Sequence, residues 1–288
     1  MIDTDLVYAR AETPEEAVLA WQEFTEKGSK SAESVRYLGG GTEIVTGARK
    51  GNAPAVVIDI KRIVEARCLE LSQGKIHIGA ALPLNEAGDS RLFPLLTATV
   101  RGIADRTTRN RLSVGGNIAG TLPYREAALP LLLTDATILT IRPGPPGRSP
   151  LRAERPLRSL FEKRLRLEPG ELVIGFSVSE EAASLPWKHY RATRSAPVDY
   201  PLVTACFLDR RAAHDRIAVA HDRVAVAHDR VAVAVSGLHP YPVYFESVTA
   251  FRSALAEPST GRTDQRATAA YRLALAADML SRAEEELA

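Results

Sequence analysis

Cysteine is scarce in this 288-residue chain, in which only Cys68 and Cys206 are present. Iron–sulfur clusters are held by sets of cysteine thiolates, as are many structural zinc sites, and this chain has no cysteine cluster for either. Both cysteines stand among apolar residues. This favours two buried, reduced thiols over a single disulfide.

The sequence also lacks long apolar runs and a strong charge of one sign. No apolar stretch reaches the ~18 residues of a membrane-spanning helix. The net charge of +2 is too close to zero to predict a nucleic-acid or membrane partner. Two acids in the first five residues and no apolar core exclude a secretory signal there, so we expect a cytoplasmic protein. Its length allows one large domain or two smaller ones with a sizeable core.

What is present is a mixed pattern of helices and strands. Residues 13–24 predict a helix, with Thr13 as its N-cap and Glu16 completing a capping box. Up to residue 60 we expect the order helix, strand, glycine turn, strand. After that we expect a strand over 75–84, a helix over 93–104 and a glycine-interrupted strand over 109–122. A helix and then a strand are predicted over 126–141, a surface loop over 143–150 and a further strand over 171–178. Residues 179–186 are the best candidate domain boundary, followed by strands and by C-terminal helices.

A heptad repeat, HDRIAVA-HDRVAVA-HDRVAVAV, begins at His214, His221 and His228. In a helix the three histidines would share one face and could bind a metal. The alternating β-branched residues favour strands instead, where a shift of seven residues reverses the face. We therefore interpret the repeat as redundant hairpin sequence, with a histidine metal site as the alternative.

Two glycine-rich segments carry the chemistry. The first, LGGGTEIV (38–45), follows a predicted strand and is neither a Walker A loop nor a GxGxxG motif. It is either a tight structural turn or an anion site made of backbone N–H groups. The second, SVGGNIAGTLPYRE (113–126), joins a glycine pair to Asn117 and Glu126. Taken alone such a pair is more often a bulge, but two loops at strand ends suggest two walls around one long ligand.

Together these segments resemble the FAD-binding subunit, or middle domain, of the molybdenum hydroxylases, a family that includes xanthine dehydrogenases and aerobic carbon monoxide dehydrogenases. Further resemblance follows in order along the chain, over residues 76–87, 161–178, 187–209 and 233–243. The resemblance implies an α+β fold: a two-subdomain FAD-binding fold of the vanillyl-alcohol oxidase (PCMH) type plus a small C-terminal α+β domain. The implied boundaries are 1–178 for the FAD-binding domain, with subdomains 1–60 and 61–178, and 187–288 for the C-terminal domain.

The resemblance also implies where FAD would bind. The backbone of the first loop would hold the pyrophosphate, Ser113 and Asn117 would lie in the second wall, and Val173 would touch the flavin ring. Glu126 stands where the family has Asp, and Arg191 stands near a family Lys, which keeps the charge but changes the geometry. The full set of expected cofactor contacts is Leu38, Gly39, Gly40, Gly41, Thr42, Glu43, Ile44, Ser113, Gly116, Asn117, Glu126, Val173 and Arg191.

The implied function is that of an electron-transfer subunit. In the family, electrons pass from a molybdenum-cofactor large subunit through an iron–sulfur subunit with two [2Fe–2S] clusters to FAD, and the terminal acceptor is not specified by this sequence. No side chain is required as a nucleophile or acid, and we interpret His77, His189 and His239 as structural or solvated. The alternatives are a stand-alone FAD oxidoreductase of the same fold and a flavin-free scaffold subunit.

Overall fold

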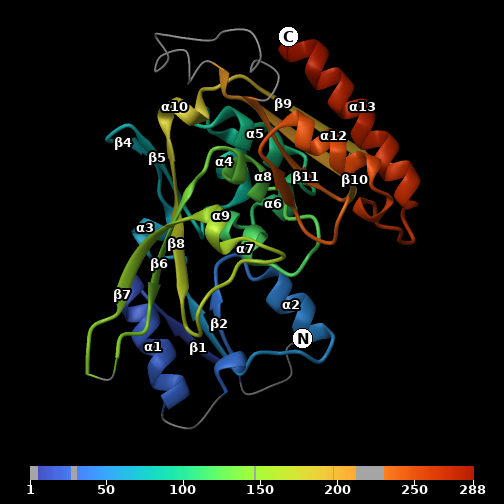
Figure 1. Cartoon of the computed structure of the whole chain (residues 1–288). Coiled ribbons are helices and arrows are strands. Elements are labelled where there is room, and N and C mark those ends of the chain that lie inside the picture. Colours follow the sequence, from blue (N-terminus) through green and yellow to red (C-terminus); the bar gives the residue numbers. More distant parts are fainter. Residues whose placement is uncertain (1–5, 27–30, 146, 197, 212–229) are drawn as a thin grey trace.

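The computed structural model describes residues 6–26, 31–145, 147–196, 198–211 and 230–288. Within these ranges the chain forms three β-sheets, each packed against its own helices (Figure 1). Over the same ranges, no helix has both the length and the apolar character needed to cross a membrane. The repeat histidines His214, His221 and His228 lie outside the described residues.

The first sheet is parallel, with strand order β1-β3-β2. Its strands are β1 (Val7–Arg10), β2 (Val35–Leu38) and β3 (Val56–Asp59). Helix α1 (Pro14–Glu26) begins as predicted, because the Thr13 hydroxyl accepts the Glu16 N–H at 3.1 Å. The 3₁₀ turn η1 (Ala32–Ser34) leads into β2. The predicted order up to residue 60 was wrong in two places, since it lacked β1 and lacked helix α2 (Thr42–Arg49), which follows the first glycine loop directly.

The second sheet is antiparallel, with strand order β4-β5-β8-β6-β7. Its strands are β4 (Leu69–Ser72), β5 (Lys75–Gly79), β6 (Thr137–Arg142), β7 (Leu151–Pro156) and β8 (Leu172–Ser179). The helices around it are α3 (Val64–Arg67), α4 (Leu84–Asp89), α5 (Pro94–Arg101), α6 (Arg106–Arg109), α7 (Val114–Ala119), α8 (Ala128–Leu133), α9 (Leu157–Leu160) and α10 (Glu180–Ala183). The strand predicted over 75–84 is shorter than expected: β5 ends at Gly79, and helix α4 already begins at Leu84.

The predicted glycine-interrupted strand over 109–122 was also wrong, since this segment contains helix α7. The Ser113 side chain caps that helix by accepting the Gly116 N–H. The N–H groups of Val114 and Gly115 donate to the carbonyls of Leu82 and Ala80. A Cβ on Gly115 would stand 2.6 Å from the Cβ of Ala80, so glycine is needed here for close packing between segments.

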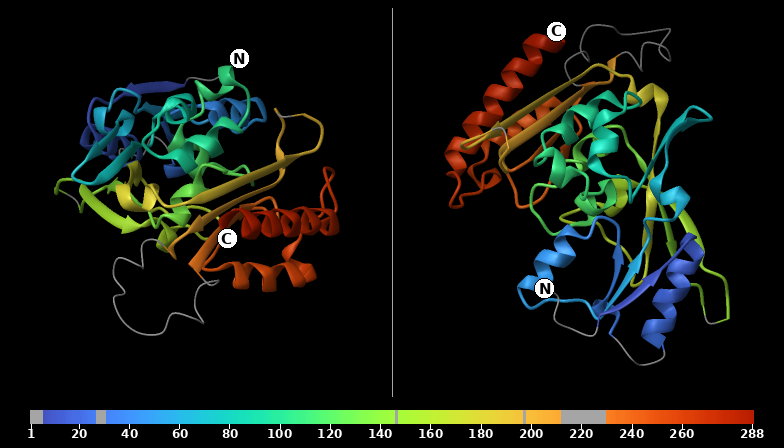
Figure 2. Two further views of the ribbon diagram at one scale, coloured as in Figure 1. Left: turned by 90° about the horizontal axis from the view of Figure 1, so that it is seen from above. Right: turned by 180° about the vertical axis from the view of Figure 1, so that it is seen from behind.

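The third sheet is antiparallel, with strand order β12-β11-β10-β9. Its strands are β9 (Trp187–Thr193), β10 (Pro201–Asp209), β11 (Val231–Ser236) and β12 (Val243–Phe245). Helices α12 (Val248–Ala256) and α13 (Ala269–Leu287) cover its outer face, and the 3₁₀ turn η3 (Pro258–Thr260) lies between them (Figures 1 and 2). The opposite face belongs to the central core, because Cys206 and Ala234 pack in the same cluster as α8 and β8.

The two thiols are unpaired, as expected. Cys206 is fully buried, and burial raises the pKa of its thiol to about 12. Cys68 is only half-buried, which corrects the expectation of two buried thiols. It ends helix α3, where its Sγ donates to the Glu65 carbonyl at 3.2 Å.

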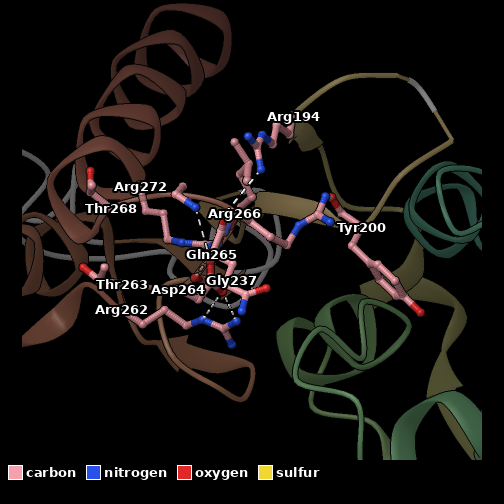
Figure 3. A network of polar contacts seen from close by, with 12 residues as sticks. Arg194, Tyr200, Gly237, Arg262, Thr263, Asp264, Gln265, Arg266, Thr268 and Arg272 are labelled. Carbon is pink, nitrogen blue, oxygen red and sulfur yellow. Dashed lines mark hydrogen bonds and ion pairs between the residues drawn. The ribbon is translucent and has the colours of Figure 1, made fainter.

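A buried cation fixes the C-terminal helix to the third sheet (Figure 3). Arg272 of α13 is fully buried and donates to the carbonyl oxygens of Leu202 and Gly237. Its ion-pair partner is Asp264, at 2.8 Å. Burial acts to raise the pKa of Asp264, but hydrogen bonds from Arg262, the Arg266 N–H and Arg272 outweigh it and hold that pKa below its usual value.

Replacing Asp264 with Asn should therefore lower the free energy of unfolding at pH 7 by about 3 kcal/mol, because it leaves Arg272 buried without its counter-charge. A carboxylate with a lowered folded-state pKa contributes stability above its unfolded pKa of about 3.9 and loses it as the pH falls. The difference in Tm between wild type and Asp264→Asn should thus shrink below about pH 4. The control is Asp278→Asn on the exposed side of α13, and equal Tm values for all three proteins at pH 7 would contradict the prediction.

Candidate functional site

The first glycine loop connects strand β2 to helix α2 and presents its backbone donors in a row. The N–H groups of residues 39–44 donate to no acceptor within the described part of the chain, and all six residues are half-buried. Three of these groups belong to the first turn of α2, where the helix dipole adds a partial positive charge. The loop therefore offers a concentrated set of donors to an anion.

Glycine is required in this loop for two separate physical reasons. Gly41 is the N-cap of α2 and has a left-handed backbone, with φ of 77°. Gly40 lies against the second loop, and a Cβ there would collide with the carbonyl of Arg111. A Cβ on Gly39 would stand 3.0 Å from the Ser113 Oγ. The structure thus shows that the bare backbone of residues 39 and 40 also serves close packing between the two loops.

Glu43 joins the two loops on their other side. Its carboxylate accepts the N–H groups of Thr121, at 2.9 Å and 3.0 Å, and of Leu122, at 3.2 Å. The Glu43 carboxylate also lies within 3 Å of the position that a Cβ on Gly120 would take. These contacts place α2 beside the segment that follows α7 (Figure 1). They also commit the Glu43 side chain to a contact within the protein.

Several N–H groups of the second loop donate to acceptors within the protein. Besides the Ser113 cap and the bonds of Val114 and Gly115, the Asn117 N–H donates to the Ser113 carbonyl at 2.9 Å. The Asn117 Oδ1 accepts the Ala127 N–H at 3.0 Å, which fixes the start of α8. In the described structure the second loop therefore acts mainly as a rigid support for the first.

A buried ion pair lies at the end of the second loop. Glu126 and Arg191 meet at 2.9 Å, with only 4% and 9% of their side chains exposed. The Glu126 Oε1 accepts both the Arg191 Nε–H and, at 2.6 Å, the Thr204 hydroxyl. The other oxygen, Oε2, accepts no hydrogen bond from the described residues. Thr204 lies opposite Arg191 in the pairing of β9 with β10, so the third sheet brings both residues to Glu126.

The structure thus brings Gly39–Ile44 next to Ser113, and Arg191 next to Glu126. Leu38 ends β2 beside the loop, where a Cβ on Gly41 would stand 2.7 Å from its Cδ1. Gly116 is exposed on α7. Val173 lies on a different element, β8, nearly buried in the central cluster and opposite Thr140 of β6.

Sequence reasoning missed two features next to Glu126. Tyr124 stacks on Tyr200, with ring centroids 5.3 Å apart, and the guanidinium groups of Arg262 and Arg266 each lie 5.7 Å from one of these rings. Arg125, which follows Tyr124 in the chain, is buried. The sequence carried one usable sign, because Tyr124 and Arg125 lie within the same PYRE segment as Glu126.

His189 lies on β9, two residues before Arg191. Burial, followed by the positive charge of Arg191, lowers the pKa of His189 to about 4. Among the described residues no group of three His, Cys, Asp or Glu side chains is arranged to hold a metal. The arrangement is suited to binding and orienting a ligand rather than to acid–base chemistry.

A row of N–H donors at a helix N-terminus fits a diphosphate, and a buried carboxylate with one unused oxygen fits a hydrogen-bond donor on a ring system. FAD has both chemical features, so the residues present fit this cofactor.

Comparison with known proteins agrees with this geometry. The family model described as "FAD binding domain in molybdopterin dehydrogenase" matches residues 4–178. No curated protein sequence matches the chain. Carbon monoxide dehydrogenase from Hydrogenophaga pseudoflava is 21% identical with a TM-score of 0.77, covering 99% of this chain and 98% of the other. Reconstituted CO dehydrogenase from Oligotropha carboxidovorans is 19% identical with a TM-score of 0.78, covering 99% and 98%. Quinoline 2-oxidoreductase from Pseudomonas putida 86 is 15% identical with a TM-score of 0.74, covering 97% and 95%.

The structural similarity confirms the predicted α+β fold of PCMH type with a C-terminal α+β part. The family match, which spans more than half of the chain, confirms the resemblance seen in the two glycine motifs and identifies FAD as the cofactor. This protein belongs to the family of FAD-binding domains of molybdopterin dehydrogenases.

Proposed function

We propose that this chain is the flavoprotein subunit of a molybdenum hydroxylase complex and that it passes electrons from iron–sulfur clusters through FAD to an acceptor. The observation that carries the proposal is the row of N–H groups over residues 39–44, at the N-terminus of α2, which find no acceptor in the described part of a chain of this family. Because these donors are backbone groups, no side chain has to lose conformational entropy when they bind the cofactor's diphosphate.

The residues around Glu126 would hold the flavin end of the cofactor. The Arg191 and Thr204 bonds to Oε1 fix the carboxylate in one orientation and leave Oε2 for a donor on the ligand. We propose that Val173 lines the same site from β8. The other members of the site are the predicted contacts on the two glycine loops: Leu38, Gly39, Gly40, Gly41, Thr42, Glu43, Ile44, Ser113, Gly116 and Asn117. For Glu43 and Asn117 the structure supports an indirect role, since each side chain holds a backbone N–H of the protein.

The cysteine count supports a role as one part of a larger enzyme. FAD exchanges electrons singly or in pairs, so it can connect one-electron iron–sulfur donors to a two-electron acceptor. Two unpaired cysteines cannot hold two [2Fe–2S] clusters, so the electron donor belongs on another polypeptide. We propose two partners: an iron–sulfur subunit with two [2Fe–2S] clusters and a molybdenum-cofactor large subunit.

Domain boundaries at residues 1–60, 61–178 and 187–288 remain part of this proposal. Two features support it: each range contains its own sheet, and α10 and the residues after it connect the second sheet to the third. The central core nevertheless extends across the last boundary, because Cys206, Leu208, Ala232 and Ala234 pack against it.

The isolated chain should bind FAD and transfer electrons from a chemical reductant to an acceptor, but it should oxidise no purine, aldehyde or carbon monoxide. Adding the iron–sulfur and molybdenum partner chains should restore flavin reduction by substrate, measured as bleaching of flavin absorbance. Rapid reduction of the flavin in the isolated chain by a small organic substrate would instead show a stand-alone oxidoreductase. Failure of the folded wild-type chain to bind FAD would show a scaffold.

Replacing Gly41 with Ala should weaken FAD binding at least tenfold, because a Cβ at a φ of 77° costs about 1–2 kcal/mol and displaces the first turn of α2. The matched control is Gly47→Ala within the same helix, where the nearest atom to the new Cβ would be the Asn52 carbonyl oxygen at 3.5 Å. That variant should keep FAD and gain about 0.5–1 kcal/mol of stability. Flavin titration with circular dichroism measures both effects, and wild-type affinity in Gly41→Ala would contradict the prediction.

A further inference from the structure

Arg125 is a buried cation beside the proposed cofactor site. Only 4% of the residue is exposed, and it directly precedes Glu126. Its backbone has a φ of 37°, a left-handed value that is uncommon outside glycine and that turns the chain between Tyr124 and Glu126. The guanidinium lies 5.4 Å from the centre of the Phe161 ring.

The polar groups of Arg125 are incompletely satisfied. One Nη donates to the Lys163 carbonyl at 2.6 Å, whereas the buried Nε has no hydrogen-bond partner among the residues that the structure describes. No carboxylate of the described residues lies within ion-pair distance of it. The other buried cations near this region differ, since Arg191 pairs with Glu126 and Arg272 pairs with Asp264.

A buried arginine without a counter-ion lowers the stability of the free protein. The guanidinium remains charged in proteins, and taking a charge out of water costs several kcal/mol unless it is paired. Burial accordingly lowers the pKa of Arg125, and the acid that opposes this effect is Glu43, on the first turn of α2. Leu122, three residues before Arg125, donates its N–H to the Glu43 carboxylate at 3.2 Å. The segment that carries Arg125 is therefore held beside the helix end whose N–H groups have no acceptor in the described part of the chain.

We propose that Arg125 is a further cofactor-binding residue, whose charge is neutralised by the diphosphate of FAD bound at the first glycine loop. This inference rests on the proposed function and adds a residue to it. It also explains why a cation is kept in this buried position: the anion that pairs with it is the ligand, so the cost in the free protein is recovered on binding.

The test compares Arg125→Gln with wild type, using apoprotein and two separate readouts. Glutamine removes the charge but can still donate to the Lys163 carbonyl. The dissociation constant for FAD should rise at least tenfold at low ionic strength. The difference in this constant between the variant and wild type should become smaller as salt is added. The inhibition constant of ADP, which carries a diphosphate without a flavin, should rise similarly, and riboflavin binding should stay unchanged. The Tm of the apoprotein should stay the same or rise by about 2 °C, because an unpaired buried charge is removed.

Three further variants separate charge from structure. Arg125→Lys keeps a cationic side chain and should bind FAD more tightly than Arg125→Gln does. Arg125→Met removes the charge without adding a polar group, so it replaces Arg125→Gln where the glutamine variant does not fold. Arg211→Gln removes the ion-pair partner of the buried Asp209 side chain at the end of β10, so it should lower the apoprotein Tm without changing FAD affinity.

The proposal is overturned if Arg125→Gln binds FAD and ADP as wild type does, or if Arg125→Lys loses as much affinity as Arg125→Gln. It is equally overturned if Arg125→Gln loses as much affinity for riboflavin as for FAD, because the charge would then act on the ring system and not on the diphosphate. If the wild-type chain binds no FAD at all, the proposed function fails instead, and the two failures are thereby distinguished.

Discussion

The contact between the two glycine loops is the constraint on which the proposed site depends. Gly40 lies against the Arg111 carbonyl, and the Glu43 carboxylate holds the Thr121 and Leu122 N–H groups. These contacts fix α2, which belongs to the first sheet, against the helices of the second sheet. The first loop can keep N–H groups that have no acceptor in the described part of the chain because the second loop holds it in place. A ligand then meets preorganised donors instead of having to order them.

Three buried arginines show how differently this fold treats positive charge. Arg272 and Arg191 each have a carboxylate partner, and each joins segments far apart in the chain, at the outer and inner faces of the third sheet. Among the described residues, Arg125 contacts a carbonyl oxygen and an aromatic ring but has no carboxylate partner. Buried ion pairs add little net stability, but breaking one is costly, so paired arginines fix geometry. An unpaired one is destabilising by itself and points to a counter-charge supplied from outside the chain.

The third sheet contributes to the site as well as to the C-terminal part of the molecule. Arg191 and Thr204 reach Glu126 from its inner face, while α12 and α13 cover its outer face. Because the central core continues into β10 and β11, this sheet cannot move freely against the second one. The proposed flavin end of the site is therefore built from the second and third ranges of the chain, while the first range supplies the loop proposed for the diphosphate.

The sequence by itself determined the helix starting at Pro14, the strands with alternating or continuous apolar residues, the scarcity of cysteine ligands, and the family, since glycine motifs and β-branched runs are local properties of the chain. It misread residues 42–49 and 114–119, because glycine and β-branched residues have weak helix propensity and both helices depend on contacts with other segments. Only the tertiary structure decided that Gly40 faces a carbonyl, that Glu43 and Asn117 hold backbone N–H groups, and that Arg125 is buried without an acid. Each of these facts depends on a residue distant in sequence, which local pattern cannot specify.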